Sequence, residues 1–63
     1  MDLNQELINK ILEIIKSNKR GTTIKEIMEN LKISRFTADK YLYYLKGAKM
    51  IEERRIGRLR LYY

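Results

Sequence analysis

The spacing of apolar residues changes once along this chain, and that change limits the folds open to it. From Leu3 to Leu45 the apolar residues recur mostly at helical spacing, the pattern of amphipathic helices. Near the end, Arg58-Leu59-Arg60-Leu61 alternates basic and apolar side chains, which is the period of a β-strand. We therefore predict a mainly α fold that ends in a small β-hairpin, formed as a single domain over residues 1–63.

The first helix is predicted over about residues 2–17. Asp2 followed by Gln5 resembles a capping box, which places the helix start there. The apolar side chains spread over roughly 180° of the helix, wider than the roughly 100° stripe that a core-facing helix requires. The extra width lies near Leu3, Leu7 and Ile14. Either a small domain wraps around this helix, or these three residues form a dimer interface with a second copy of the chain.

Two further helices follow, joined by a short connector. Thr23 with Glu26 fits a capping box, which predicts a helix over about 24–31. Ser34 is a good N-cap for a third helix over about 35–46, because its hydroxyl can accept a hydrogen bond from a free N–H of the first turn. Two helices joined by a turn of about three or four residues form a helix-turn-helix arrangement. The third helix is expected to bury one face, made of Ala38, Tyr41, Leu42 and Leu45.

The C-terminal hairpin is predicted over about 50–63. Its antiparallel strands are expected at about Met50–Arg55 and Arg58–Tyr63, with Gly57 in the turn. Thr22-Thr23-Ile24 is compatible with a very short additional strand, so the sheet has two or three strands.

The basic charge is confined to the second half of the chain. The net charge is +6, from 14 basic and 8 acidic residues. Residues 1–31 carry five of each sign, whereas residues 32–63 carry nine basic and three acidic residues. A neutral half joined to a basic half indicates a scaffold with a surface for a polyanion. The alternative is a solvated basic face that only keeps the protein in solution.

The residue types argue against an enzyme. The sequence has no Cys and no His, which removes disulfides, thiolate metal sites and the commonest general base. It has no Gly-rich phosphate loop either. We predict no catalysis, no metal, no cofactor and no small-molecule ligand. The start of the chain lacks the pattern of a signal peptide, and no apolar run approaches the roughly 20 residues of a membrane span. We expect a cytoplasmic protein without membrane contact.

The order of these elements resembles the winged helix-turn-helix superfamily, in particular small archaeal and bacterial transcription regulators. Three stretches carry the resemblance, and with the first helix it covers essentially the whole chain. Thr23–Leu31 is similar to the positioning helix, Ile33–Leu45 to the recognition helix and Met50–Tyr62 to the wing. One departure is Lys49, which stands where the family often has Gly before the wing. A non-glycine residue is strained at positive φ, so the departure concerns the wing angle more than the fold.

The resemblance implies binding of double-stranded DNA, with the third helix in the major groove and the wing on the minor groove or backbone. The candidate DNA-binding residues of the third helix are Ser34, Arg35, Phe36, Thr37, Lys40, Tyr43 and Tyr44. Those of the wing are Arg54, Arg55, Arg58 and Arg60, with Arg58 at the tip as the best candidate for the minor groove. Phe36 either contacts a thymine methyl group or folds back onto the first turn or the wing. Asp39 either pairs with Arg35, four residues earlier, or accepts a hydrogen bond from cytosine N4, and the pair within the helix is favoured.

The leading hypothesis is a sequence-specific transcription regulator that binds a palindromic or near-palindromic site as a homodimer. Two alternatives stay open: a winged-helix module for protein–protein interaction within a larger assembly, and binding of RNA or DNA without sequence preference. The charge split favours DNA over the interaction module, because such a module needs no basic excess in its third helix and wing.

Overall fold

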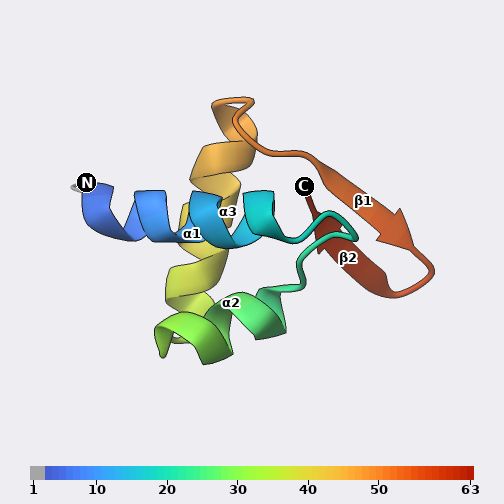
Figure 1. Ribbon diagram of the computed structural model, residues 1–63, viewed down its shortest axis with the longest axis horizontal. Helices are drawn as coiled ribbons and strands as arrows, with labels where there is room; N and C mark the ends of the chain where they lie inside the picture. The colour runs from blue at the N-terminus through green and yellow to red at the C-terminus, as the bar shows by residue number, and fades with distance from the viewer. Residues whose placement is uncertain (1–2) are drawn as a thin grey trace.

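The computed structural model describes residues 3–63 as three helices followed by a two-stranded antiparallel hairpin (Figure 1). The elements are α1 (Gln5–Ser17), α2 (Ile24–Leu31), α3 (Arg35–Gly47), β1 (Glu53–Ile56) and β2 (Leu59–Tyr62). In Figure 1, α1 crosses in front of α3, α2 lies below them and the hairpin projects to one side. This is the architecture of a winged helix-turn-helix, as predicted, and we call the hairpin the wing.

The start of α1 differs from the sequence-based prediction. The helix begins at Gln5, and its N-cap is Asn4, whose side chain accepts hydrogen bonds from the N–H groups of Glu6 and Leu7 at 2.9 and 3.2 Å. The predicted start at residue 2 was therefore wrong, and Asp2 itself lies outside the described residues. The backbone N–H of Asn4 also donates to the Tyr41 hydroxyl at 2.8 Å, which ties this end of α1 to α3.

The starts of α2 and α3 agree with the predictions. The Thr23 hydroxyl accepts from the N–H of Glu26 at 3.2 Å, and the Glu26 carboxylate accepts from the N–H of Thr23 at 3.4 Å, which completes a capping box. The Ser34 hydroxyl accepts from the N–H of Thr37 at 3.1 Å. Between the two helices, Lys32 adopts a left-handed conformation with φ 54°, which ends α2 and turns the chain into α3.

A single core lies between the helices and the base of the wing. α1 contributes three isoleucines, and the predicted face of α3 is buried as expected. The wing contributes Tyr62, and the segment before it contributes Ile51. The buried apolar residues are Ile8, Ile11, Ile15, Ile27, Ala38, Tyr41, Leu42, Leu45, Ile51 and Tyr62. Because the buried face of α3 packs against α2 and shares the core with α1, the opposite face of α3 is left free.

The wing strands are shorter than predicted. Lys49 has φ 60°, and the N–H of Met50 donates to the carbonyl of Leu45 at 3.0 Å. These residues therefore belong to the turn that ends α3 and not to the start of a strand. The predicted strand start at Met50 was therefore wrong, and Lys49 adopts the left-handed conformation without glycine. Glu52 and Tyr63 still exchange two backbone hydrogen bonds of 2.9 Å, just beyond the strands proper.

The loop between α1 and α2 closes on the base of the wing. In place of a third strand, Thr22 forms a single antiparallel bridge with Tyr62, through two backbone hydrogen bonds of 2.9 and 2.8 Å. Gly21 has φ 99°, and a Cβ atom there would lie 2.9 Å from the Tyr63 ring. Glycine is therefore needed where this loop and the wing meet.

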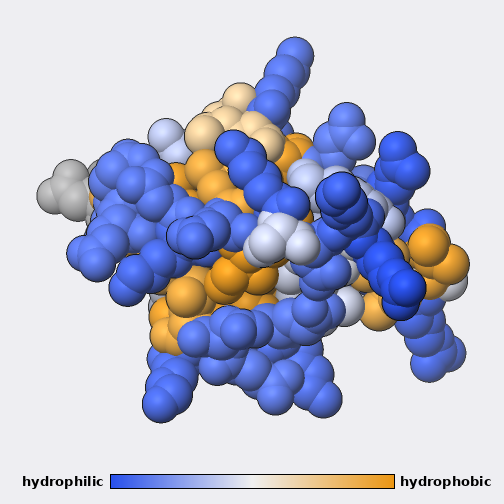
Figure 2. Space-filling view, in the orientation of Figure 1, coloured by the Kyte–Doolittle hydropathy of each residue, from blue (hydrophilic) through white to orange (hydrophobic). Residues whose placement is uncertain are grey.

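Hydrophilic side chains cover most of the face shown in Figure 2, with apolar side chains visible between them. None of the helices within residues 3–63 combines the length and the apolar character that crossing a bilayer requires.

Candidate nucleic-acid interface

The free face of α3 carries two large aromatic side chains. Phe36 is 76% exposed and Tyr43 is 78% exposed, so both rings project into solvent. The interpretation in which Phe36 folds back onto the first turn or the wing is therefore wrong. Tyr44, on the flank of this face, is also exposed but to a smaller extent.

The polar candidates at the start of α3 have intramolecular partners. The hydroxyls of Ser34 and Thr37 lie 3.0 Å apart within the N-cap, so both side chains hold the first turn of the helix. Arg35 pairs with Asp39 at 3.7 Å, as predicted, and both side chains are mostly exposed. Lys40 is half-buried, with its ammonium nitrogen 5.6 Å from the centre of the Tyr41 ring. Arg35 and Lys40 are thus the two cationic side chains in the N-terminal half of α3.

The register of the wing separates its side chains into two faces. Glu53 lies opposite Tyr62, and Arg55 lies opposite Arg60. Residues directly opposite each other share a face, and successive residues alternate, so these four form one side of the wing, which we call the α3-side face. The other side, which we call the outer face, is made of Arg54, Ile56, Leu59 and Leu61.

Glu53 connects the wing to α3. Its carboxylate lies 3.3 Å from the Lys46 ammonium and 3.6 Å from the Arg55 guanidinium. Burial raises the pKa of Glu53, but the hydrogen bond from Lys46 and the positive charges of Lys46, Arg60 and Arg55 together outweigh this and lower the pKa below its usual value. Glu53 is thus held as a carboxylate that fixes the α3-side face of the wing toward α3.

Burial raises the pKa of Tyr62, and the negative charge of the neighbouring Glu53 adds to this effect. The Tyr62 side chain is therefore held as a neutral phenol at the base of the groove.

A groove of about 1060 Å³ runs between the free face of α3 and the α3-side face of the wing. We call it the α3–wing groove. Its lining includes Phe36, Lys40 and Tyr43 from α3, and Arg60 and Tyr62 from the wing. Aromatic surface and cations from two separate elements therefore converge in one concave site, which suits a ligand with both anionic and apolar parts.

The four wing arginines do not share one environment. Arg55 and Arg60 lie on the α3-side face, beside the groove. Arg54 lies on the outer face, with its guanidinium 5.3 Å from the centre of the Tyr63 ring. Arg58 follows Gly57 in the two-residue turn at the tip and makes no ion pair within residues 3–63. The sequence-based prediction grouped these residues, but the structure places two of them on the α3-side face and only Arg60 in the lining of the α3–wing groove.

The tip of the wing has an apolar outer face. Ile56 and Leu59 pair across the strands next to the turn and are 63% and 48% exposed. Figure 2 shows hydrophobic surface at this end of the wing. Both side chains lie on the face opposite Arg55 and Arg60, so they are outside the α3–wing groove.

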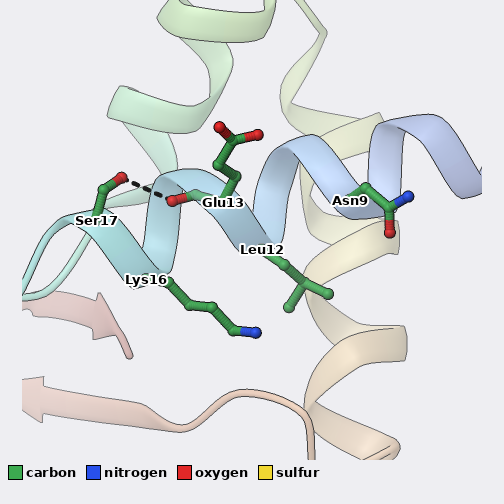
Figure 3. A pocket seen from close by; sticks show the side chains of 5 residues that line it. All are labelled: Asn9, Leu12, Glu13, Lys16 and Ser17. Carbon is green, nitrogen blue, oxygen red and sulfur yellow. Dashed lines mark hydrogen bonds between the residues drawn. The ribbon is translucent and has the colours of Figure 1, made fainter.

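A second hollow lies on α1, and its polar side chains do not point toward a common centre. Its volume is about 500 Å³, and it is lined by Asn9, Leu12, Glu13, Lys16 and Ser17. Figure 3 shows Glu13 pointing away from the side on which Leu12 and Lys16 extend, while the Ser17 hydroxyl donates to the Glu13 carbonyl at 2.7 Å. The polar groups thus either point away from one another or form hydrogen bonds within α1. Among residues 3–63, no group of acidic side chains is arranged to hold a metal ion.

The predicted dimer residues of α1 are only partly free. Leu7 and Ile14 on α1, and Leu3 just before it, are half-buried and pack against the edge of the core. Leu3 also lines the α3–wing groove. The wide apolar face of α1 is thus partly explained by the domain itself, and a dimer interface there stays a prediction.

Sequence reasoning missed Lys46 and Glu53 as elements of the site. Their pairing joins residues seven positions apart across a turn whose path depends on the positive φ of Lys49. The sequence signal that could have indicated this pair is Glu53, an acidic residue at the start of the wing next to Arg54 and Arg55.

A family model described as HTH domain matches residues 8–55. The matched range includes all of α2 and α3, most of α1 and the start of the wing. Comparison with curated proteins gave no match, and comparison with solved structures gave none either.

Proposed function

The chain belongs to the helix-turn-helix (HTH) domain family, and on this basis we propose that it is a sequence-specific DNA-binding protein that regulates transcription. Family membership supports DNA binding, and domains of this kind are typically binding modules rather than enzymes. In this proposal residues 1–63 act as one DNA-binding domain whose partner is double-stranded DNA.

The observation that carries the proposal is the α3–wing groove. An HTH places its second helix in the major groove, with the N-terminal residues of that helix nearest the base edges. α3 would then present Arg35, Phe36 and Lys40 to the bases, since these lie in its N-terminal half and outside the core. Arg60 lines the same groove, Arg55 lies opposite it on the same face of the wing, and both would contact phosphates.

The remaining candidates have supporting roles in this proposal. Ser34 and Thr37 hold the first turn of α3 in position through the N-cap. Tyr43 and Tyr44 offer hydroxyl groups farther along the helix. Arg58, at the tip, is suited to an adjacent minor groove, and Arg54 contacts the backbone only where DNA reaches the outer face.

The first test is a fluorescence-anisotropy titration of random-sequence duplex DNA at several salt concentrations. We expect dissociation constants of about 10⁻⁴–10⁻⁶ M near physiological salt that weaken steeply as salt rises. Lys40→Ala and Arg60→Ala should each weaken binding and reduce the salt slope by about one. Lys10→Ala is the matched control, because Lys10 is an exposed cation on α1 that pairs with Glu6, on the helix that shares the core with the buried face of α3.

Absence of binding even at low salt would reject the proposal, and a winged-helix module for protein–protein interaction would take its place. Equal losses in Lys40→Ala, Arg60→Ala and Lys10→Ala would show that net charge, and not the α3–wing groove, drives association. Selection of a preferred sequence from a random library would then separate specific binding from binding without sequence preference.

We also propose that the protein binds its site as a homodimer through α1. The support is the partial exposure of Leu7 and Ile14, which leaves apolar surface on α1 outside the α3–wing groove, whereas Leu3 lines that groove. Sedimentation equilibrium should give twice the chain mass of 7.6 kDa at the concentrations that bind DNA. A 7.6 kDa species throughout that range would reject the dimer and leave DNA binding by a monomer.

A further inference from the structure

The free face of α3 carries two large aromatic side chains, whereas hydrogen bonds to base edges require polar side chains. Phe36 and Tyr43 are 76% and 78% exposed, so neither ring contributes much to the core. An exposed ring forgoes the free energy that burial would provide, so these two side chains do not serve the stability of the domain. Their function must be sought in what the helix contacts.

The two rings are in line along α3. They are seven residues apart, which at 3.6 residues per turn places them within about 20° of each other around the helix. Along the axis the separation is about 10.5 Å, from a rise of about 1.5 Å per residue. Base pairs in B-DNA are about 3.4 Å apart along the DNA axis, and a helix lying along the major groove is inclined to that axis, so it would set the two rings about two to three base pairs apart.

The floor of the major groove offers one apolar group to such rings, the C5-methyl group of thymine. We propose that α3 recognises DNA in which two thymine methyl groups lie about two to three base pairs apart, one against Phe36 and the other against Tyr43. This inference rests on the proposed function and specifies the sequence class that the α3–wing groove prefers.

The residue between the rings is consistent with this arrangement. Lys40 lies between Phe36 and Tyr43 along the helix and also lines the α3–wing groove. Its ammonium group can donate to guanine O6 and N7, or to phosphate. Tyrosine at the second position extends farther than phenylalanine, which suits a helix whose N-terminal end lies deepest in the groove.

The test begins with the sequence that the wild-type protein selects from a random duplex library. Each thymine of that site is then replaced singly by deoxyuridine, which removes only the methyl group, and affinity is measured by competition anisotropy. We expect two positions, about two to three base pairs apart, at which the replacement weakens binding about fourfold, the equivalent of about 0.8 kcal/mol.

Variants assign each methyl group to a ring. Phe36→Ala should bind the thymine and deoxyuridine forms equally at one position, and Tyr43→Ala should do so at the other. Met50→Ala is the control, because Met50 is an exposed apolar residue outside α3, and it should retain both effects. Since Phe36 and Tyr43 are mostly exposed, both variants should fold, and circular dichroism checks that they do.

Three results would overturn the inference: a selected site without such a pair of thymines, no effect of deoxyuridine on the wild type, or the same effect in Phe36→Ala and Tyr43→Ala as in the wild type. Tighter binding of single strands than of duplex would also overturn it, because the rings would then stack on exposed bases. If the wild type binds no duplex at all, the proposed function itself fails, and that outcome is visible before any deoxyuridine is introduced.

Discussion

Replacing glycine by alanine is expected to have opposite effects at two positions of this domain. Gly47 is the last residue of α3, and a Cβ atom there would meet nothing within 4 Å. Glycine costs a helix about 0.8–1.0 kcal/mol relative to alanine in the interior, and somewhat less near an end. We therefore expect Gly47→Ala to raise the free energy of unfolding by about 0.5–1 kcal/mol, which raises Tm by about 4–8 °C in a domain of this size.

Gly21→Ala is the matched comparison. Its φ of 99° is rarely adopted by residues with a side chain, and the new Cβ would lie 2.9 Å from the Tyr63 ring and 3.0 Å from Cβ of Leu61. The conformational cost of about 1–2 kcal/mol and an overpacking cost of about 1–3 kcal/mol together give a loss of about 2–5 kcal/mol. A domain of 63 residues is expected to have only about 3–9 kcal/mol in total, so this variant should be close to unfolding.

Both variants are measured by thermal and urea unfolding followed by circular dichroism. The reasoning is refuted if Gly47→Ala lowers Tm, or if Gly21→Ala unfolds at the wild-type temperature. Anisotropy on duplex DNA adds a second readout for Gly47→Ala. Because Gly47 is on the same free face of α3 as Phe36 and Tyr43, a more stable variant that binds DNA less tightly would show that the partner approaches this end of the helix.

Three further predictions concern the cap of α2 and the wing. Thr23→Ala removes half of the capping box and should lower the free energy of unfolding by about 1 kcal/mol in urea titrations, whereas no change would mean that water replaces the cap. The pKa of Glu53 is lowered from its usual value of 4.5, so the ionised side chain stabilises the fold above that pH and this contribution is lost as the pH falls through the lower folded-state pKa. The acid-unfolding profile of Glu53→Gln should lack this loss of stability, and a profile identical to that of the wild type would contradict the assignment. Arg55→Ala should weaken DNA binding and its salt dependence more than Arg54→Ala, because only Arg55 lies on the α3-side face, and equal losses would refute that division of the wing.

Local chemistry explains why α2 and α3 were predicted well. Their start signals are hydrogen bonds between residues three positions apart, so the sequence around Thr23 and Ser34 contains all the partners involved. α1 differs, because Asp2 and Asn4 are both good N-cap residues by type. At Asn4 the helix start also gains a hydrogen bond to Tyr41, 37 residues away. A partner at that distance does not appear in any local pattern.

The wing shows a stricter limit on what a sequence can specify. Strict alternation identifies which residues share a face of a strand, and it correctly separated Arg60 from Leu59 and Leu61. Alternation carries no information on which face meets the rest of the protein, since that depends on the path of the chain between α3 and β1. Here the positive φ of Lys49 sets that path, and the pairing of Glu53 with Lys46 holds the result.

The same limit affects how the charge of this domain is interpreted. Counting residues assigned the whole excess of +6 to the second half, as though it faced one partner. In the structure, Arg54 is directed to the outer face, while Asp39 and Glu53 line the groove beside the cations. The field at the α3–wing groove is therefore weaker than the net charge implies, and discrimination between DNA sequences has to come from contacts at the free face of α3. Neutralising Asp39 as Asp39→Asn should then tighten binding to random DNA, because it removes a carboxylate that repels phosphates and releases Arg35 from its ion pair, and unchanged affinity would contradict this view of the groove.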